Sequence, residues 1–373
     1  GEGVRFVNAI APSSWTRPSM LSLETGLYPN PYMGAPDTPA PVRYTIDDSL
    51  EIMPEWFASY GFDTWAWVTN GNCYTNYGFN QGYASGHFNE IGFIRSASVV
   101  DAVLPTLASV RPPFFFYVHF VDSHGSYNPP ADYHDHFGAW PVMTAADQNS
   151  LLPSNFNDFL NDTLKAWAFG DPRTFPVLTA GGIDGMHYYY EAETSYLDSQ
   201  LERLIDGILA QYPNTIFVIT ADHGEELMEH GAFGHGYTLH QELVHVPFIL
   251  HGPNLSPAVI DYPVATLGML PTLAGMLRLP PSDQWQGADM LTDPGNTPIF
   301  QHTRFNLYDR FDLQASAVRQ GSFTLIDSNI ESGPQLFDLD ADPGEFADVS
   351  GSYPDVVETL QQALADHLAL FAK

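Results

Sequence analysis

An aspartate and a histidine stand side by side in ADHGEELMEHGAFGHG, directly after a short apolar run. Carboxylate oxygen and imidazole nitrogen are both good ligands for a divalent cation. Neighbouring residues reach one metal only from an irregular backbone, which Gly224 permits. Asp222 and His223 are therefore candidate metal ligands, although an isolated pair of this kind more often belongs to a solvated loop. His235, between two glycines of the same stretch, is a further candidate.

Hydroxyl side chains gather around Thr16 in APSSWTRPSMLSLETGLYP, just before a short helical pattern. One interpretation is structural: Thr16 is the N-cap, Pro18 lies in the first turn, the helix runs from Ser19 to Thr25, and Gly26 follows its end. The other is chemical. A helix N-terminus offers free N–H groups and a positive dipole end, which would stabilise an alkoxide on Thr16 and the anion that it attacks. The local sequence is compatible with both.

Four short apolar runs predict buried strands that would position these residues. They lie in residues 63–70, 112–121, 214–220 and 246–253. Near-continuous apolar runs are typical of a parallel sheet that is covered on both faces. Helical patterns precede three of the runs, in residues 49–61, 96–110 and 188–212. Alternating helices and strands predict a doubly wound α/β fold.

Ligands of doubly wound sheets bind at the carboxyl ends of the strands. Asn70, His124, Asp222 and His223 all fall at such ends. Taken alone, His124 would more often be a loop histidine, and Asn70 is closer to a turn residue. Their shared place in the predicted sheet favours a common site.

Two segments differ in pattern from the predicted sheet. Residues 125–187 have weak periodicity and predict a long insertion near the active-site face. After about residue 295 the pattern indicates short antiparallel strands and an amphipathic helix over 354–372. The apolar positions of this helix are Val357, Leu360, Leu364, Leu368 and Leu370. We therefore predict a catalytic domain over 1–294 and a C-terminal subdomain over 295–373.

The charge balance limits the partners. The 373 residues include 13 Lys and Arg against 44 Asp and Glu, a net charge of −31. Such an acidic surface repels nucleic acid and anionic membranes, so we expect no nucleic-acid partner. No apolar run is long enough to span a bilayer, and a soluble protein is expected. The single cysteine, Cys73, leaves no intramolecular disulfide. An anionic substrate would need a local positive centre, for which a bound metal is the natural candidate.

Four motifs together resemble the sulfatase family of the alkaline phosphatase superfamily. They are APSSWTRPSMLSLETGLYP, HFVDSHGSYNPP, ITADHGEELMEHGAFGHGYTLHQELVHVPFILHGP and QLFDLDADPGEFADV. They occur in the order of the family and span nearly the whole chain. The resemblance implies an alkaline-phosphatase-like α/β/α sandwich with a mostly parallel sheet, and a smaller C-terminal α+β subdomain.

The resemblance also implies roles for individual residues. Thr16 occupies the position of the nucleophile and, with Asp222 and His223, would bind one divalent metal ion, Ca²⁺ or Mn²⁺, with Zn²⁺ as the alternative. His235 matches a position that contacts the transferred group. His124 matches a histidine that can help to protonate the leaving group.

Arg17 and Asn70 are expected to bind the substrate. Arg17 stands in a motif where the sequence departs from the family, whose pattern is Cys-x-Pro-Ser-Arg, because Thr16 replaces the cysteine and Met20 the arginine. Formylglycine is made from Cys or Ser, so none is expected. Thr at this position is similar to the branch that contains phosphodiesterases, phosphonate hydrolases, and phosphoglycerol or phosphoethanolamine transferases. Family members also begin with a strand of metal-binding aspartates before a segment like GVRFVNAIAP. That strand is absent from this sequence, so we expect a fragment of a longer protein.

These observations predict a metal-dependent hydrolase or transferase that cleaves phosphate or sulfate esters through Thr16. The expected substrate is a small anionic ester, such as a phosphorylated or sulfated sugar, lipid or aryl ester. We expect phosphate rather than sulfate esters, because the formylglycine precursor is missing. The alternative is a non-catalytic sulfatase-fold protein that binds anionic glycans, or an inactive fragment.

Overall fold

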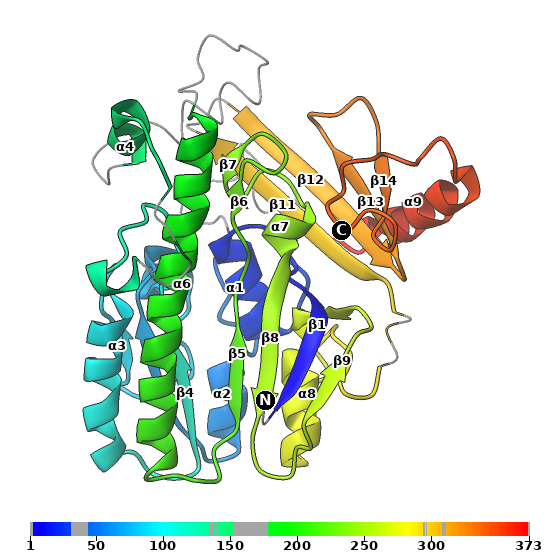
Figure 1. Cartoon of the computed structure of the whole chain (residues 1–373). Helices are drawn as coiled ribbons and strands as arrows, with labels where there is room; N and C mark the ends of the chain where they lie inside the picture. The colour runs from blue at the N-terminus through cyan, green and yellow to red at the C-terminus, as the bar shows by residue number, and fades with distance from the viewer. Residues whose placement is uncertain are drawn as a thin grey trace.

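The computed structural model describes residues 3–30, 44–134, 138, 141–151, 178–293, 295, 297–307 and 311–371. An α/β part carries helices on both faces of its sheets, and an antiparallel sheet with the last helix stands beside it (Figure 1). Much of the insertion expected over 125–187 lies outside the described residues. Within the described ranges, no helix combines the length and the apolar character that crossing a bilayer requires.

The larger sheet is built around β1 (Val4–Ile10), which pairs in parallel with β9 (Ala258–Ile260) and β10 (Val264–Ala265). Its other neighbour is β8 (His245–His251), which is antiparallel both to β1 and to β5 (Phe217–Thr220). The apolar run behind β8 was expected in a parallel sheet. An apolar run reports burial and contains no information on strand direction, so this pairing was not accessible from the run itself.

The smaller sheet is parallel throughout. β2 (Asp63–Val68) lies between β3 (Phe88–Glu90) and β4 (Phe114–Val118). Successive residues of β2 face opposite layers, as the pleat requires. Trp67 packs with α3 and α6, whereas Ala66 packs into the core that holds α1, α2 and α8. The bounds of these helices are Thr16–Thr25 for α1, Met53–Ser59 for α2, Ser96–Val103 for α3, Ala180–Leu209 for α6 and Met269–Leu277 for α8. The predicted α/β/α sandwich is confirmed.

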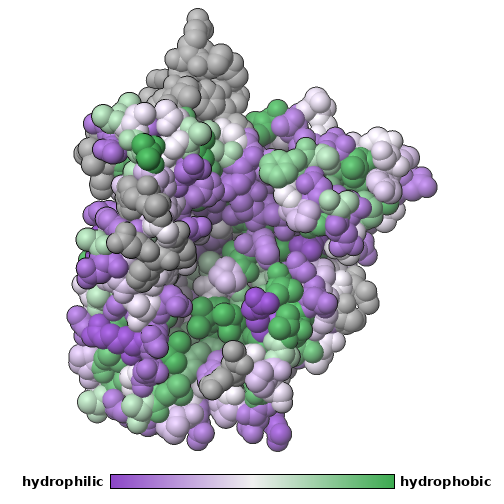
Figure 2. All heavy atoms as spheres, viewed as in Figure 1, coloured by the Kyte–Doolittle hydropathy of each residue, from purple (hydrophilic) through white to green (hydrophobic). Residues whose placement is uncertain are grey.

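Two of the edge strands lead toward the site described below. β4 ends the smaller sheet and β5 ends the larger one. Every residue of both strands is only half-buried. Figure 2 shows hydrophobic surface beside α6 in the lower half of the view, around the position that β5 takes in Figure 1. β4 and β5 do not pair with each other, and the residues that follow their carboxyl ends contribute to the site described below.

Helix α6 begins earlier than the pattern over 188–212 predicted. Three glycines in its first turns weaken the helical signal there, namely Gly181, Gly182 and Gly185. The Thr179 side chain accepts a hydrogen bond from Gly182 N and caps the helix. The pattern over 96–110 is divided into α3 and a 3₁₀ turn at Leu104–Ala108. Further short α-helices and strands of the described residues are α4 (Ala145–Leu151), β6 (Glu226–Leu227), β7 (Phe233–Gly234) and α7 (Gln241–Val244).

The C-terminal sheet is an antiparallel meander, as predicted. Its strands are β11 (Ile299–Leu307), β12 (Phe311–Gln320), β13 (Phe323–Ser328) and β14 (Gln335–Asp338). Helix α9 (Pro354–Ala369) covers it and buries Leu360 and Leu364. Leu370 was expected in the same apolar stripe but is 61% exposed, because the helix ends one residue before it.

Candidate active site

Thr16 is the first residue of α1 and is buried, at 2% exposure. The N-cap residue is Trp15, which makes no side-chain capping bond, so the interpretation of Thr16 as N-cap is wrong. The Thr16 hydroxyl lies 3.2 Å from Nε2 of His223 instead. The expected end of the helix is confirmed, since Gly26 adopts a left-handed φ of 69° and its N–H bonds to Ser22.

His223 presents one nitrogen to Thr16 and anchors the other. Its Nδ1 lies 2.7 Å from the carbonyl oxygen of Gly224. A carbonyl can only accept, so Nδ1 carries the proton and Nε2 of the neutral ring keeps its lone pair. Burial lowers the pKa of His223 and favours this neutral form. A ring held in this way is suited to accept the Thr16 proton or to ligate a metal ion.

Asp222 is hydrogen-bonded to α1 through its backbone, although the two are far apart in the sequence. The Ser19 hydroxyl donates to the backbone oxygen of Asp222 at 2.5 Å, which fastens the first turn of α1 to the chain that follows β5. The carboxylate oxygen Oδ2 is buried and has no hydrogen-bond partner, at 3.5 Å from His223 Nε2. Burial acts to raise the pKa of Asp222, but His223 and His119 outweigh it and hold the pKa below its usual range.

These groups fit a divalent cation in part. The described part of the chain contains no cluster of three or more His, Cys, Asp or Glu side chains placed to bind a metal ion. Asp222 nevertheless offers an unpartnered buried oxygen next to His223 and the Thr16 hydroxyl. A buried anion without a partner is costly, and a cation would satisfy it. Asp222 and His223 are the residues that would hold the ion, with further ligands from solvent or substrate oxygens.

Asn70 is a turn residue and also a neighbour of Thr16. Its side-chain oxygen accepts from Asn72 N at 2.9 Å and caps a 3₁₀ turn over Gly71–Cys73. Its side-chain nitrogen lies 3.4 Å from the Thr16 hydroxyl. The structure thus brings Asn70 to the N-terminal end of α1, and the turn that it caps keeps it there.

Arg17 is held beside the same turn. Its guanidinium donates to Asn72 Oδ1 at 2.7 Å, and the guanidinium carbon lies 3.7 Å from the centre of the Tyr77 ring. The ring contact and the hydrogen bond hold the guanidinium next to the 3₁₀ turn that Asn70 caps. Asn72 and Tyr77 were not identified from the sequence, because neither belongs to a recognisable motif.

Glu225 pairs with His235 and was also missed. His235 Nδ1 lies 2.7 Å from Glu225 Oε1, and the Tyr127 hydroxyl donates to Glu225 Oε2 at 3.2 Å. Burial acts to lower the pKa of His235, but Glu225 outweighs burial and raises it. The pKa of Glu225 falls to about 2, as the histidines overcome its burial. Its place two residues after His223 was the one available sequence signal.

His124 completes the group. Its Nδ1 lies 2.6 Å from the Gly125 carbonyl oxygen, and its ring centre is 5.2 Å from that of His235. Burial, with His235 nearby, lowers the pKa of His124. The His235 ring is in turn 4.3 Å from that of His223. The structure therefore gathers the seven residues singled out in the sequence at one end of the sheets, namely Thr16, Arg17, Asn70, His124, Asp222, His223 and His235.

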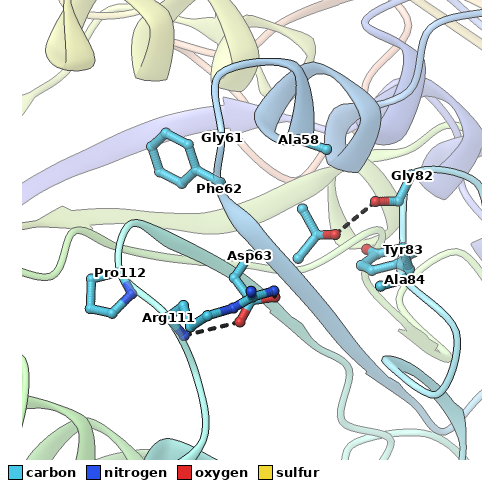
Figure 3. A pocket seen from close by; sticks show the side chains of 10 residues that line it. Ala58, Gly61, Phe62, Asp63, Gly82, Tyr83, Ala84, Arg111 and Pro112 are labelled. Atoms are coloured by element: carbon cyan, nitrogen blue, oxygen red, sulfur yellow. Dashed lines mark hydrogen bonds and ion pairs between the residues drawn. The ribbon is translucent and has the colours of Figure 1, made fainter.

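A surface hollow of about 550 Å³ lies elsewhere (Figure 3). Asp63 and Arg111 are among the residues that line it, and the Arg111 backbone N–H donates to the Asp63 carboxylate. Asp63 begins β2, so the hollow opens at the amino end of that strand. The residues gathered around Thr16 lie at the opposite end of the sheet, and the hollow is separate from them.

The chain matches proteins of known family. The family model for sulfatases matches residues 1–279. The uncharacterized sulfatase YidJ of Escherichia coli K12 is 23% identical over 416 residues, which cover 98% of this chain and 80% of that protein. Against bovine arylsulfatase K the identity is 25% over 199 residues, or 49% of this chain. The match spans only 36% of the length of that arylsulfatase.

Solved structures share the fold. The phosphonate monoester hydrolase of Agrobacterium radiobacter superposes with a TM-score of 0.72 at 16% identity, over 99% of this chain and 89% of that one. A protein solved in complex with its substrate, D-glucosamine-2-N,6-O-disulfate, gives a TM-score of 0.71 at 17% identity, over 100% of this chain and 91% of that one. At such identities the likeness establishes the architecture.

The family model includes every residue gathered at the site, from Thr16 to His235. Sequence motifs, the α/β/α sandwich and the family model therefore agree, and the chain belongs to the sulfatase family.

Proposed function

We propose that Thr16 is the nucleophile of an ester hydrolase that acts on sulfur or phosphorus. The observation that carries the proposal is the 3.2 Å approach of the Thr16 hydroxyl to His223 Nε2, at the buried start of a helix. The first-turn N–H groups and the helix dipole favour negative charge at this point, on the attacking oxygen and on the group attacked. The adjacent Asp222 and His223 supply the ligands for one divalent ion.

In the proposed reaction, Thr16 loses its proton to His223 Nε2 when that nitrogen carries no ion, as in the arrangement seen here, and to solvent when it does. Its oxygen then bonds to the sulfur or phosphorus as the bond to the leaving oxygen breaks. Water or an acceptor hydroxyl displaces the Thr16 oxygen from the adduct and restores the hydroxyl. A bound divalent ion would neutralise charge on the ester oxygens and lower the pKa of the nucleophile. We propose Ca²⁺ or Mn²⁺, with Zn²⁺ as the alternative.

The two remaining histidines are suited to different tasks. His235 faces a carboxylate at 2.7 Å, which stabilises the doubly protonated ring and so provides a proton donor for the leaving oxygen. His124 faces a carbonyl at 2.6 Å, so its neutral ring offers a lone pair at Nε2. His235 is therefore the better acid, and His124 is placed to accept a hydrogen bond from the substrate. Arg17 and Asn70 would bind the non-reacting oxygens.

Phosphate or phosphonate esters are the preferred substrates in this proposal. A threonine side chain cannot form the aldehyde hydrate through which formylglycine sulfatases release sulfate. The Thr16 adduct must be displaced by an external nucleophile instead. The structural likeness to a phosphonate monoester hydrolase is compatible with this substrate class. Sulfate esters remain the second class to be tested.

The test is turnover of p-nitrophenyl phosphate, bis-p-nitrophenyl phosphate and p-nitrophenyl sulfate, each with Ca²⁺, Mn²⁺ or Zn²⁺ added. We expect Thr16→Ala to abolish phosphate-ester turnover and Thr16→Ser to retain part of it. Thr359→Ala on the exposed face of α9 is the matched control and should behave as wild type. Turnover of the sulfate alone would refute the substrate preference. Absence of metal binding and of any Thr16-dependent turnover would favour the non-catalytic alternative.

A further inference from the structure

Phe93 is an exposed aromatic ring at the edge of the candidate active site. Its side chain is 59% exposed. It follows Gly92, whose φ of 78° turns the chain after β3. The Phe93 ring nevertheless has one specific neighbour, since its centre lies 5.3 Å from that of His124 at an interplanar angle of 81°.

Phe93 is the outer end of a row of rings that begins at the nucleophile. His223 touches Thr16, and His235 lies 4.3 Å from His223 between ring centres. His124 follows at 5.2 Å, and Phe93 at a further 5.3 Å. Exposure is 2% at Thr16 and 59% at Phe93, and the three histidines between them are half-buried. The row thus leads from the buried reacting end to solvent.

We propose that Phe93 is a specificity-determining residue that stacks against a six-membered ring of the leaving group. This inference rests on the proposed function. An oxygen that leaves opposite Thr16 departs toward the histidines that can bind or protonate it. A ring attached to this oxygen then lies beyond His124, where Phe93 offers an open face. Aryl rings and the C–H faces of pyranose rings both pack on such a surface, whereas a methyl group is too small to cover it.

A purely structural role would give a different pattern. If Phe93 served only to hold the His124 ring, its removal would impair all esters alike through His124. If Phe93 binds the leaving group, its removal impairs esters with a ring and spares those without one. The structural role predicts a lower kcat for every ester, whereas binding of the leaving group predicts a higher KM for esters with a ring alone.

The first experiment measures binding of the leaving group without any reaction. Dissociation constants of p-nitrophenol and of methyl β-D-glucopyranoside are measured by saturation-transfer NMR for wild type, Phe93→Ala and Phe93→Tyr. We expect binding of one or both probes to weaken about 3- to 10-fold in Phe93→Ala, the range for one aromatic contact, and to survive in Phe93→Tyr. Tyr353→Ala, another exposed aromatic, on the C-terminal subdomain, is the control. The two probes distinguish an aryl from a sugar leaving group. Failure of both to bind wild type, or equal binding to Phe93→Ala, would overturn the proposal.

The second experiment compares phenyl phosphate with methyl phosphate. For Phe93→Ala we expect a 3- to 10-fold rise in KM for the phenyl ester and unchanged constants for the methyl ester. An equal fall in kcat for both esters would refute the stacking role while leaving the Thr16 mechanism intact. Conversely, Phe93-dependent binding of the probes without any Thr16-dependent turnover would refute the proposed function alone. The two failures are therefore distinguishable.

Discussion

His235 donates its Nδ1–H to Glu225 across 2.7 Å, although ten residues separate the two in sequence. The pair stands between the His223 and His124 rings. A histidine bonded to a buried carboxylate is oriented by it and is stabilised in its cationic form. Glu225 thereby orients His235 beside the His223 and His124 rings, and is itself held by Tyr127.

We expect Glu225→Gln to lower kcat for Thr16-dependent turnover about 10- to 100-fold, within the range of general acid catalysis. A neutral amide still accepts the hydrogen bond but does not stabilise the protonated ring. Steady-state kinetics on p-nitrophenyl phosphate measures the change. Glu358→Gln, at an exposed position of α9, is the control. An unaltered kcat in Glu225→Gln would show that the reaction makes no use of this pair.

Asp222→Asn should remove the response of the protein to divalent ions. The Oδ2 atom that loses its charge is buried and unpartnered, so it is the oxygen that a cation would satisfy. A ligand at about 100 times its dissociation constant stabilises the fold by about 2.7 kcal/mol. We therefore expect Ca²⁺ or Mn²⁺ to raise the Tm of wild type and of the exposed control Asp355→Asn, but not that of Asp222→Asn. An equal rise in all three would place the ion elsewhere.

The C-terminal subdomain should be sensitive to acid through two buried histidines. His367 of α9 stacks on Phe300 at 3.9 Å and on His302 at 5.1 Å, and the Nε2 atoms of both histidines lack hydrogen-bond partners. Burial lowers the pKa of His302 to about 3 and that of His367 to about 4. The unfolded chain binds protons near its ordinary pKa of about 6.5, well before the folded chain does. Their contribution to stability is complete above about pH 6.5 and is lost progressively below it.

His367→Phe keeps the stacked ring and removes one of these protonation sites. We expect the fall in Tm between pH 7 and pH 5 to be smaller in this variant than in wild type. His245→Gln, which alters an exposed histidine, should leave the fall unchanged. If His367→Phe has the same acid dependence as wild type, the buried pair does not govern it.

Glu24 lies inside α1 with 1% exposure, and its Oε2 atom has no partner. Burial raises its pKa to about 8. The folded chain therefore holds a proton that the unfolded chain releases above about pH 4.5, so stability falls as the pH rises from there to about 8. Glu24→Gln should remove a penalty of about 3 kcal/mol at pH 7, as an upper bound. Urea unfolding at pH 5 and pH 8 would reveal a gain that is larger at pH 8. A gain independent of pH would contradict the buried carboxyl as its cause.

Much of the site was accessible from the sequence. The motifs singled out Thr16, Asp222 and His223, and the apolar run before Asp222 ends at Thr220, where β5 also ends. These residues and the end of β5 could be recognised because the signals are local. Burial of a short apolar run, a glycine at a helix end and adjacent side chains of types that can ligate metals are all encoded within a few residues.

Tertiary structure decided the rest, because the decisive contacts join distant parts of the chain. Thr16 and His223 are 207 positions apart in the sequence, yet the Thr16 hydroxyl lies 3.2 Å from His223 Nε2. The hydroxyl makes this contact instead of capping the helix. Neither the direction of β8 nor the exposure of Phe93 follows from local pattern, since apolar periodicity reports burial alone. Residue types and spacing determined which chemistry was available. Packing determined which neighbours surround each of the groups that would perform it, and thereby set the orientation, the exposure and the protonation of each group.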